Sequence, residues 1–272
     1  MGSTDIEIII LGCGGSGGTP LVGNHWGNCD PSEPKNTRTR ASIAIHTART
    51  CVVIDTGPDF RTQINREDIG NIDAVIYSHA HADHIHGFDD VRYASIKRRI
   101  NGEDDYMIPI YAQKNTLNDI KAIFPYMFKV SDDGLYRPLI QDNELQYSDS
   151  LTVGDITIQT FDQIHGAGQS MGFRIGDIGY STDVSEMTDA GLNALNGIHT
   201  WIVDCGQYGA NEEDLTVHPN LERVLRWNET VQADKLYLTH LTPRTDYQTT
   251  NEETPDYIEC SYDGLKLKAS LE

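Results

Sequence analysis

The feature that most constrains this chain is a short run of metal-binding side chains placed directly after an apolar segment. Residues 73–77 have the branched apolar composition of a buried strand, and residues 79–84 that follow read His-Ala-His-Ala-Asp-His. A solvated polar loop can contain one histidine by chance, but three imidazoles and a carboxylate separated by alanines indicate a metal-binding site. Imidazole nitrogen and carboxylate oxygen are ligands for zinc, manganese or iron. The fold therefore has to let these side chains converge at the end of this strand.

Polar side chains follow other predicted strands in the same way. The pattern predicts strands at 6–11, 41–47, 51–55, 73–77, 108–111, 151–161, 171–175, 178–180, 200–204 and 235–239, and helices at 59–66, 87–99, 114–124 and 219–232. The residues at or just after strand ends include Asp55, His79, Asp183, Asp204 and His240. Strands mixed with helices along the whole chain predict an α/β (α+β) fold, whose sites are built where strand ends meet at one edge of a sheet.

Domain organisation is expected to be simple. The sequence shows no internal repeat and no linker rich in Pro, Ser or Gly. Layered α/β folds reach about 250 residues as one domain, so we expect a single domain over residues 1–270. The last two residues, 271–272 (Leu-Glu), resemble a cloning scar.

Charge and composition limit the classes of partner. The chain has 41 acidic and 21 basic residues among 272, a formal net charge of -20. Such a field repels long nucleic acids, whereas a small phosphate ester remains compatible with it because bound metal ions reverse the local field. No apolar run approaches the ~18 residues of a membrane span, and no signal peptide is visible. The five cysteines contain no C-x-x-C pair, so we expect reduced thiols and a cytoplasmic location without membrane contact.

The order of the motifs resembles the metallo-β-lactamase-fold hydrolase superfamily, whose signature is H-x-H-x-D-H. Its other motifs also have counterparts here: Asp55-Thr-Gly, His165 in Asp-Gln-Ile-His, Asp183 in Tyr-Ser-Thr-Asp, and His240 in Leu-Thr-His. The resemblance covers residues 6–245. It implies a four-layer αββα sandwich, with two mixed β-sheets face to face and helices outside.

Carried over position by position, the resemblance implies a dinuclear metal centre with zinc or manganese, or alternatively iron. The implied ligands are His79, His81 and His165 for one ion, Asp83, His84 and His240 for the other, and Asp183 between them. Two ions sharing a water would supply hydroxide near neutral pH. Asp55 would accept a hydrogen bond from a metal-bound imidazole, and His86 would also lie behind the ligands. His25, His46 and His199 have no supporting context and are interpreted as ordinary histidines.

Two further stretches resemble the PhnP-type cyclic phosphodiesterases of this superfamily. They are the glycine-rich segment 11–20 and the segment His218-Pro-Asn-Leu-Glu-Arg. Members of that type open the cyclic phosphate of a phosphorylated ribose. The resemblance implies that His218 stabilises developing charge or protonates the leaving alkoxide, and that Asp83 is the other catalytic residue. The alternative interpretation of His218 is a cap of the 219–232 helix, with Pro219 at its first position.

The sequence departs from the PhnP pattern after the glycine-rich segment. Members of that type carry a cysteine-rich structural zinc site there, whereas this chain has Cys29 alone. A structural zinc site needs four ligands, so we expect no such site and interpret Cys29 as a packing residue.

Gly12-x-Gly-x-x-Gly fits a dinucleotide fingerprint in form, but Pro20 prevents the helix that should follow. We expect a tight turn at the rim of the site, with backbone amides near a substrate phosphate. Arg38 and Arg40 could contact that phosphate, although a solvated arginine is the commoner case.

The function that these features predict is hydrolysis of a small cyclic or diester phosphate, derived from a nucleotide or ribose, by a dinuclear metal-bridging hydroxide. Three alternatives remain open: a thioester, lactone or β-lactam hydrolase, a tRNA 3′-processing nuclease, and a non-catalytic metal or carrier protein resembling the pyrroloquinoline-quinone-associated relatives of the fold. The His218 segment argues against the first, the net charge of -20 against the second, and the complete second ligand set against the third. The family also allows a homodimer, but no sequence feature shows an interface.

Overall fold

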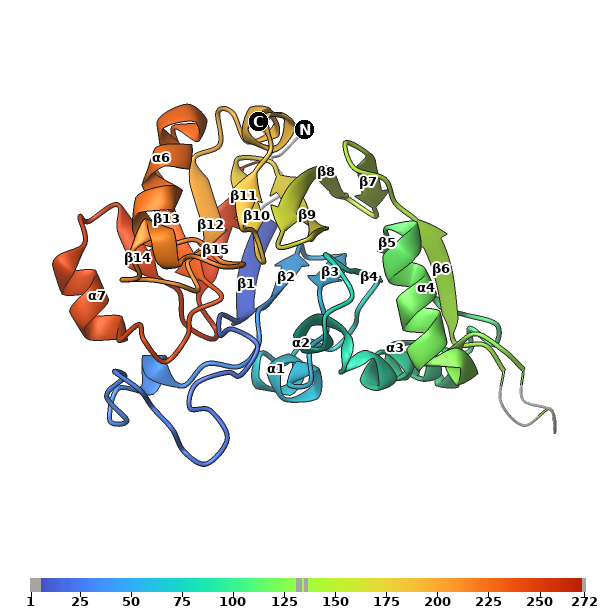
Figure 1. Cartoon of the computed structure of the whole chain (residues 1–272). Coiled ribbons are helices and arrows are strands. Elements are labelled where there is room, and N and C mark those ends of the chain that lie inside the picture. Colours follow the sequence, from blue (N-terminus) through green and yellow to red (C-terminus); the bar gives the residue numbers. More distant parts are fainter. Residues whose placement is uncertain (1–5, 131–133, 135–136, 271–272) are drawn as a thin grey trace.

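The computed structural model describes residues 6–130, 134 and 137–270 (Figure 1). The predicted cloning scar at 271–272 lies outside the described residues. Two β-sheets make up the centre of the structure. In spatial order, the first contains β15 (Lys266–Ala269), β1 (Ile6–Gly12), β2 (Ser42–His46), β3 (Cys51–Ile54), β4 (Ala74–Ile76), β5 (Ile108–Ala112) and β6 (Ile140–Glu144).

The second sheet comes from the second half of the chain. In spatial order it contains β11 (Glu186–Met187), β8 (Ile156–His165), β9 (Gly168–Ile175), β10 (Ile178–Ser181), β12 (Thr200–Asp204), β13 (Lys235–Thr239) and β14 (Ile258–Cys260), while β7 (Ser150–Val153) pairs with β8. Both sheets are mixed. In the first, β3, β4, β5 and β6 run parallel, and in the second β10, β12, β13 and β14 do.

Helices cover the outer face of each sheet (Figure 1). The first sheet is covered by α1 (Phe60–Arg66), α2 (Ala82–Ile85), α3 (Phe88–Ile100) and α4 (Lys114–Ile123). The second is flanked by α5 (Asp189–Ala194), α6 (Leu221–Val231) and α7 (Tyr247–Glu253). The described residues also form the short 3-10 turns η1 (Pro34–Asn36), η2 (Pro125–Met127) and η3 (Glu212–Asp214). Among the described residues, no helix has the length and apolarity needed to cross a membrane.

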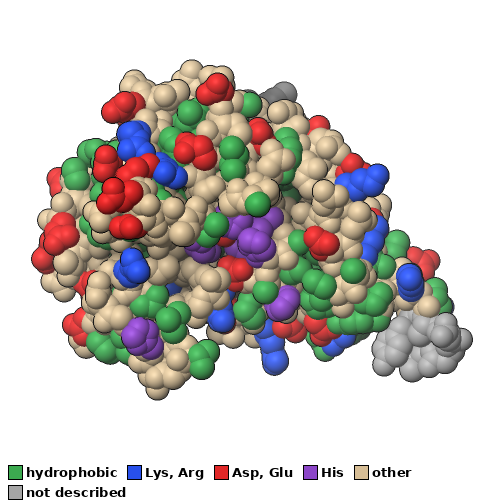
Figure 2. Space-filling view, viewed as in Figure 1, with side chains coloured by type: hydrophobic (Ala, Val, Ile, Leu, Met, Phe, Trp, Pro, Cys, Tyr) green, Lys and Arg blue, Asp and Glu red, His purple; other side chains and the backbone are tan. Residues whose placement is uncertain are grey.

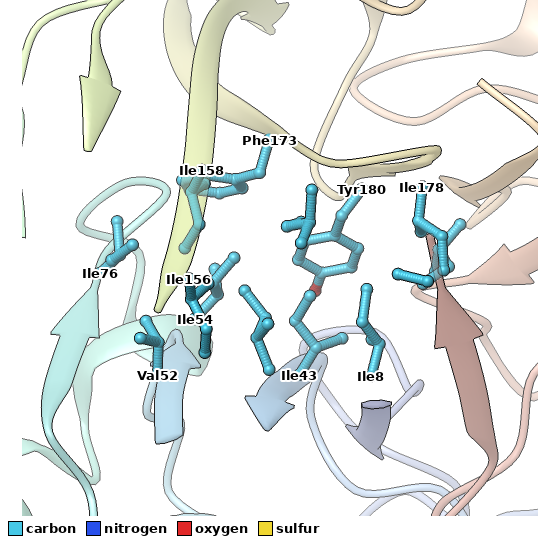
Figure 3. Close-up of a cluster of buried hydrophobic side chains, with 14 of the residues drawn as sticks. Ile8, Ile43, Val52, Ile54, Ile76, Ile156, Ile158, Phe173, Ile178 and Tyr180 are labelled. Atoms are coloured by element: carbon cyan, nitrogen blue, oxygen red, sulfur yellow. The ribbon is translucent and has the colours of Figure 1, made fainter. Parts of the chain in front are cut away.

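The core explains why the strands are apolar on both faces. Ile8 of β1 faces the second sheet and packs in the cluster between the sheets, whereas its neighbour Ile9 packs toward the helices. Successive side chains of a strand point to opposite faces, so a strand covered on both sides needs a continuous apolar run. Figure 3 shows Ile43 of the first sheet opposite Tyr180 of the second. The four-layer αββα sandwich expected from the sequence is confirmed.

Local structure differs from the sequence prediction at two places that matter for the site. The predicted strand 151–161 is two strands, β7 and β8, because Gly154 with φ +56° makes a tight turn between them. The helix predicted to begin at Pro219 begins at Leu221, and Asn220 caps it by accepting a hydrogen bond from the Arg223 amide. His218 therefore lies before the cap, and its interpretation as a helix cap is wrong.

Candidate metal centre

The first donor group brings together four side chains from three segments. His79 and His81 follow β4, His165 ends β8, and Asp183 follows β10. His165 Nε2 lies 3.3 Å from His81 Nδ1 and 3.3 Å from Asp183 Oδ1. His79 Nε2 is 3.9 Å from the same Asp183 oxygen. The structure thus places all four residues predicted for this group around one point.

The second donor group lies on the other oxygen of the same aspartate. His84 Nε2 is 2.9 Å and His240 Nε2 3.3 Å from Asp183 Oδ2. Asp83 Oδ2 lies 3.4 Å from His84 Nε2 and 3.5 Å from His240 Nε2. Because each oxygen of Asp183 faces a different group, its carboxylate is positioned between the groups as the sequence predicted.

The spacing of these atoms fits metal coordination. Four ligands about 2.1 Å from a zinc ion lie roughly 3.4 Å from one another, which is the range of most distances above. The Nε2 atoms of His79 and His240 are buried and have no hydrogen-bond partner among the described residues. Buried polar atoms without partners are costly, and a divalent ion would satisfy them. The residues present therefore fit the two divalent ions expected from the sequence.

Hydrogen bonds behind the donor groups fix the imidazoles. Asp55, fully buried, faces His84 Nδ1 at 2.7 Å and accepts hydrogen bonds from the amide of Ser78 at 2.8 Å and its hydroxyl at 2.6 Å. The Nδ1 atom of His79 lies 3.0 Å from Ser78 Oγ. The Nδ1 atom of His165 lies 3.2 Å from the carbonyl oxygen of Val217. Such contacts select the tautomer and the ring orientation of a metal ligand. The structure thus places Asp55 where the sequence predicted it.

His86 does not lie behind the donor groups. It follows α2 as its C-terminal cap residue, is exposed, and makes none of the hydrogen bonds described above. Residues two positions apart on a helix point in nearly opposite directions, so the turn that buries His84 carries His86 outward. The prediction that His86 supports a ligand is wrong.

Left-handed backbone marks three of these positions. Asp55, Asp183 and His240 have φ values of 64°, 51° and 55°. Asp55 and His240 directly follow β3 and β13, and Asp183 lies two residues after the end of β10. Residues other than glycine adopt this region at a cost, and such residues concentrate at functional sites. The left-handed conformation ends the extended strand. It points the side chain into the site, where a further strand residue would point to one face of the sheet.

Burial and neighbouring charges set the protonation of the site. Burial raises the pKa of Asp183, but His240 and His84 outweigh it and hold that pKa well below its usual range. Burial lowers the pKa of His84, yet the carboxylates of Asp183 and Asp55 raise it well above its usual range. Burial also lowers the pKa of His79. The Asp183 carboxylate is therefore ionised, which is the form that binds a metal ion.

A hydrogen-bonded pair, His218 and Asp204, lies beside the second donor group. His218 Nδ1 is 2.7 Å from Asp204 Oδ2, and the His218 ring stacks on His240 with centroids 4.4 Å apart. Asp204 is fully buried and also accepts hydrogen bonds from the amides of Val184 and Gly206. Burial lowers the pKa of His218, but the Asp204 carboxylate raises it to about 9.

Asp204 is the site residue for which the sequence suggested no role. Its position at the end of β12 was noted, and that placement was the only available signal. Its partner His218 is 14 positions further along the chain, so only the folded chain shows the pair. Gly206 makes the approach possible, since a Cβ there would lie 3.0 Å from the His218 ring and 3.1 Å from the carbonyl oxygen of His240.

A cavity of about 460 Å³ opens onto the donor groups. Its lining includes Asp83, His81, His165 and His218 together with Ser16 of the glycine-rich segment. Histidine side chains accordingly gather near the centre of the face seen in Figure 2. The glycine-rich segment thus lies at the rim of the site, as expected.

The two arginines considered for phosphate binding are already engaged. Arg38 is buried, and its guanidinium donates 2.7 Å to the carbonyl of Thr245. Arg40 pairs with Asp59 at 3.0 Å. Cys29 is also buried and its thiol contacts the carbonyl of Thr245 at 3.3 Å, consistent with a packing role. The structure therefore supports a structural role for these three side chains.

Replacing Asp55 by asparagine should weaken metal binding. The amide keeps the shape of the side chain but turns an NH2 group toward hydrogen-bond donors, so the His84 ring loses its fixed orientation. We expect metal affinity to fall about 10- to 100-fold, measured by competition with a chromophoric chelator. Asp142→Asn, on the same sheet but paired with Lys121 at the surface, is the matched control. Equal affinity in Asp55→Asn and wild type would contradict this prediction.

Comparison with known proteins adds a family and several structural relatives. The sequence matches the family model described as β-lactamase superfamily domain over residues 50–241. A crystal structure described as a new diphosphatase from the PhnP family is 31% identical, with TM-score 0.85 and 98% of each chain covered. Zn²⁺-bound PqqB from Methylobacterium extorquens is 16% identical with TM-score 0.72, covers 96% of this chain and 99% of its own, and shows a shared fold alone.

A curated relative carries a different activity in its name. An octanoyltransferase from Porphyromonas gingivalis (strain ATCC BAA-308 / W83) is 28% identical over 263 residues. The match covers 96% of this chain and 51% of the relative. The chain thus spans about half the length of the curated relative it matches.

Proposed function

Because the chain belongs to the β-lactamase superfamily and is a metallo-β-lactamase-fold hydrolase of the PhnP-like branch, we propose that it hydrolyses a small phosphate diester. A phosphoanhydride is included where the attacked phosphorus also carries an ester oxygen, since that phosphorus has two bridging oxygens as a diester does. The fold implies divalent metal ions, and the donor groups around Asp183 fit two of them. The relative described as a diphosphatase supports this class of linkage.

The observation that carries the proposal is the His218–Asp204 pair at the cavity. The carboxylate of Asp204, hydrogen-bonded to His218, raises the pKa of His218 and so favours its protonated form. Nδ1 of His218 is engaged by Asp204, which leaves Nε2 as the nitrogen that can give a proton to a leaving oxygen. An alkoxide or phosphate leaving group benefits from such an acid, whereas a thiolate does not need one. This favours phosphate esters over thioesters.

The remaining residues would bind and orient the reactants. Two divalent ions, when bound, lower the pKa of water and neutralise phosphoryl charge. His79, His81, His165, Asp83, His84, His240 and Asp183 would hold them. Asp83, which lines the cavity and which the sequence analysis names as a catalytic residue, would also orient the attacking water. Asp204 would keep His218 in the tautomer that presents its proton to the cavity.

The test is hydrolysis by protein stripped of metal and refilled with manganese or zinc. We expect turnover of bis(p-nitrophenyl) phosphate, and no turnover of an octanoyl thioester or a β-lactam. His81→Ala should lower the diester rate at least about 100-fold, because it removes a predicted metal ligand. His199→Ala, at an exposed histidine paired with Asp234, is the matched control.

Other outcomes would change the assignment. Cleavage of the octanoyl thioester alone would favour acyl chemistry, which the name of the octanoyltransferase relative suggests. No turnover of any of the three substrates, with two ions bound per chain, would favour a metal or carrier protein.

A further inference from the structure

The segment between β12 and α6, residues 205–220, makes two contacts with the site through adjacent residues; both elements are labelled in Figure 1. The carbonyl oxygen of Val217 lies 3.2 Å from Nδ1 of His165, which belongs to the first donor group. The next residue, His218, stacks on His240 of the second donor group with ring centroids 4.4 Å apart. The position of this segment therefore affects both donor groups at once.

Apolar burial does little to hold this part of the segment in place. Val217 is 37% exposed, Thr216 is exposed, and Leu215 is half-buried. In the part of the chain that the structure describes, none of residues 211–218 belongs to a hydrophobic core cluster. A segment with few buried apolar contacts opens easily, so hydrogen bonds have to fix the position of residues 216–218.

The side chain of Gln207 supplies these hydrogen bonds. Its Oε1 accepts from both the amide and the hydroxyl of Thr216, each at 2.8 Å. Its Nε2 donates to the carbonyl of Asp214 at 3.3 Å, and its backbone amide donates to the carbonyl of Pro219 at 3.1 Å. The contacts of Gln207 thus lie on both sides of residues 217–218, which line the cavity over the metal centre.

The start of the segment is fixed to the second sheet. Cys205 is fully buried, and its amide donates to the carbonyl of Thr239, at the end of β13, at 3.0 Å. The Gly206 amide donates to Asp204 Oδ1 at 2.8 Å. Gln207 comes directly after these two anchored residues, so its side chain ties the far end of the segment to the second sheet.

We propose that Gln207 is a positioning residue, which holds the Val217 carbonyl against His165 and the His218 ring in the cavity. It acts through those two histidines and belongs to neither donor group. One hydrogen-bonded side chain would then support a ligand of the first ion and the proton donor beside the second. The inference rests on the proposed function where it concerns His218, whereas the support of His165 as a ligand depends on no particular substrate.

The first experiment compares the metal affinity of Gln207→Met with that of Gln207→Glu. Methionine keeps the length of the side chain but is only a weak acceptor, whereas glutamate keeps the oxygen atoms that accept from Thr216. In Gln207→Met we expect one of the two ions to bind about tenfold more weakly, because the hydrogen bond behind a ligand has an effect of this size. Chelator competition on metal-free protein measures it. Gln207→Glu should bind that ion more tightly than Gln207→Met.

The second experiment measures how kcat depends on the leaving group, at saturating metal. In Gln207→Met, kcat on diphenyl phosphate should fall about tenfold, which is part of the contribution of a general acid. On bis(p-nitrophenyl) phosphate kcat should change less than about twofold, because p-nitrophenolate leaves without a proton from His218. Gln207→Glu should recover part of the loss on diphenyl phosphate.

The control and the opposing outcomes separate this inference from the proposed function. Gln248→Met alters an exposed glutamine of α7 whose side chain donates to Glu252, and it should match the wild type in both experiments. Wild-type metal affinity and a wild-type ratio of the two kcat values in Gln207→Met would overturn the positioning role and leave the proposed function intact. An equal loss on both diesters that Gln207→Glu does not relieve would also overturn it. No turnover of either diester by the wild-type protein, with two ions bound, would instead contradict the proposed function.

Discussion

Replacing Asp183 by alanine should remove both metal ions and lower diester turnover by about three orders of magnitude or more, equivalent to roughly 4 kcal/mol of transition-state stabilisation. The reason is the position of its carboxylate. Oδ1 lies 3.3 Å from His165 Nε2 in one donor group, and Oδ2 lies 2.9 Å from His84 Nε2 in the other. No other described side chain belongs to both of these groups, so the loss affects both ions at once.

The measurement is metal content after dialysis, by elemental analysis, together with kcat on bis(p-nitrophenyl) phosphate. Asp183→Asn keeps the shape of the side chain and removes its charge, so it serves when the alanine variant folds poorly. Asp234→Ala, at an exposed aspartate paired with His199, is the control and should keep two ions. Two ions retained in both Asp183 variants would refute the bridging role.

The second large effect is expected at His218 and Asp204. His218→Ala should lower kcat about 100-fold on a diester with a poor leaving group such as diphenyl phosphate, which is within the usual range for loss of a general acid. Bis(p-nitrophenyl) phosphate should be affected less, because p-nitrophenolate leaves without a proton. Metal content should not change. An equal effect on both substrates would mean that His218 is not the acid.

Asp204 is proposed as a positioning residue that acts through His218. Asp204→Asn should also lower kcat, and should show the same dependence on the leaving group. The double variant Asp204→Asn/His218→Ala should be no slower than His218→Ala alone, since residues that act as a unit are not additive. A double variant slower by the product of the two single effects would show that Asp204 acts independently of His218.

The sequence predicts the site better than it predicts the surroundings of the site. Several donor residues could be found because they lie at or just after a strand end, and strand ends that share an edge bring distant residues together; the assignment of Asp83 and His84, on α2, came from the resemblance of residues 79–84 to the H-x-H-x-D-H signature. Asp55 and Asp183 are examples from the two different sheets. Imidazoles and carboxylates at such positions are rarely explained by packing, so the residue types themselves indicate a functional site.

The remaining features depend on contacts that sequence spacing does not show. Arg38 is buried because it reaches the carbonyl of Thr245, 207 positions away, whereas an arginine in a polar loop is normally solvated. The short helices α5 and α7 and the edge strands were not predicted, because a few residues cannot show a helical or strand period. His86 was misplaced because its surroundings depend on the rotation of the one-turn helix α2.

The origin of the ligands has a consequence for the chain as a whole. His79, His81, Asp83 and His84 lie in the first half of the chain and follow β4 of the first sheet, whereas His165, Asp183 and His240 lie in the second half, at or after the ends of strands of the second sheet. All five cysteines are unpaired, so no disulfide connects the halves. An ion at either donor group would be a reversible crosslink between them, closing a long loop that the unfolded chain leaves open. The metal concentration would then affect the free energy of unfolding of the two-sheet fold as well as the catalytic activity.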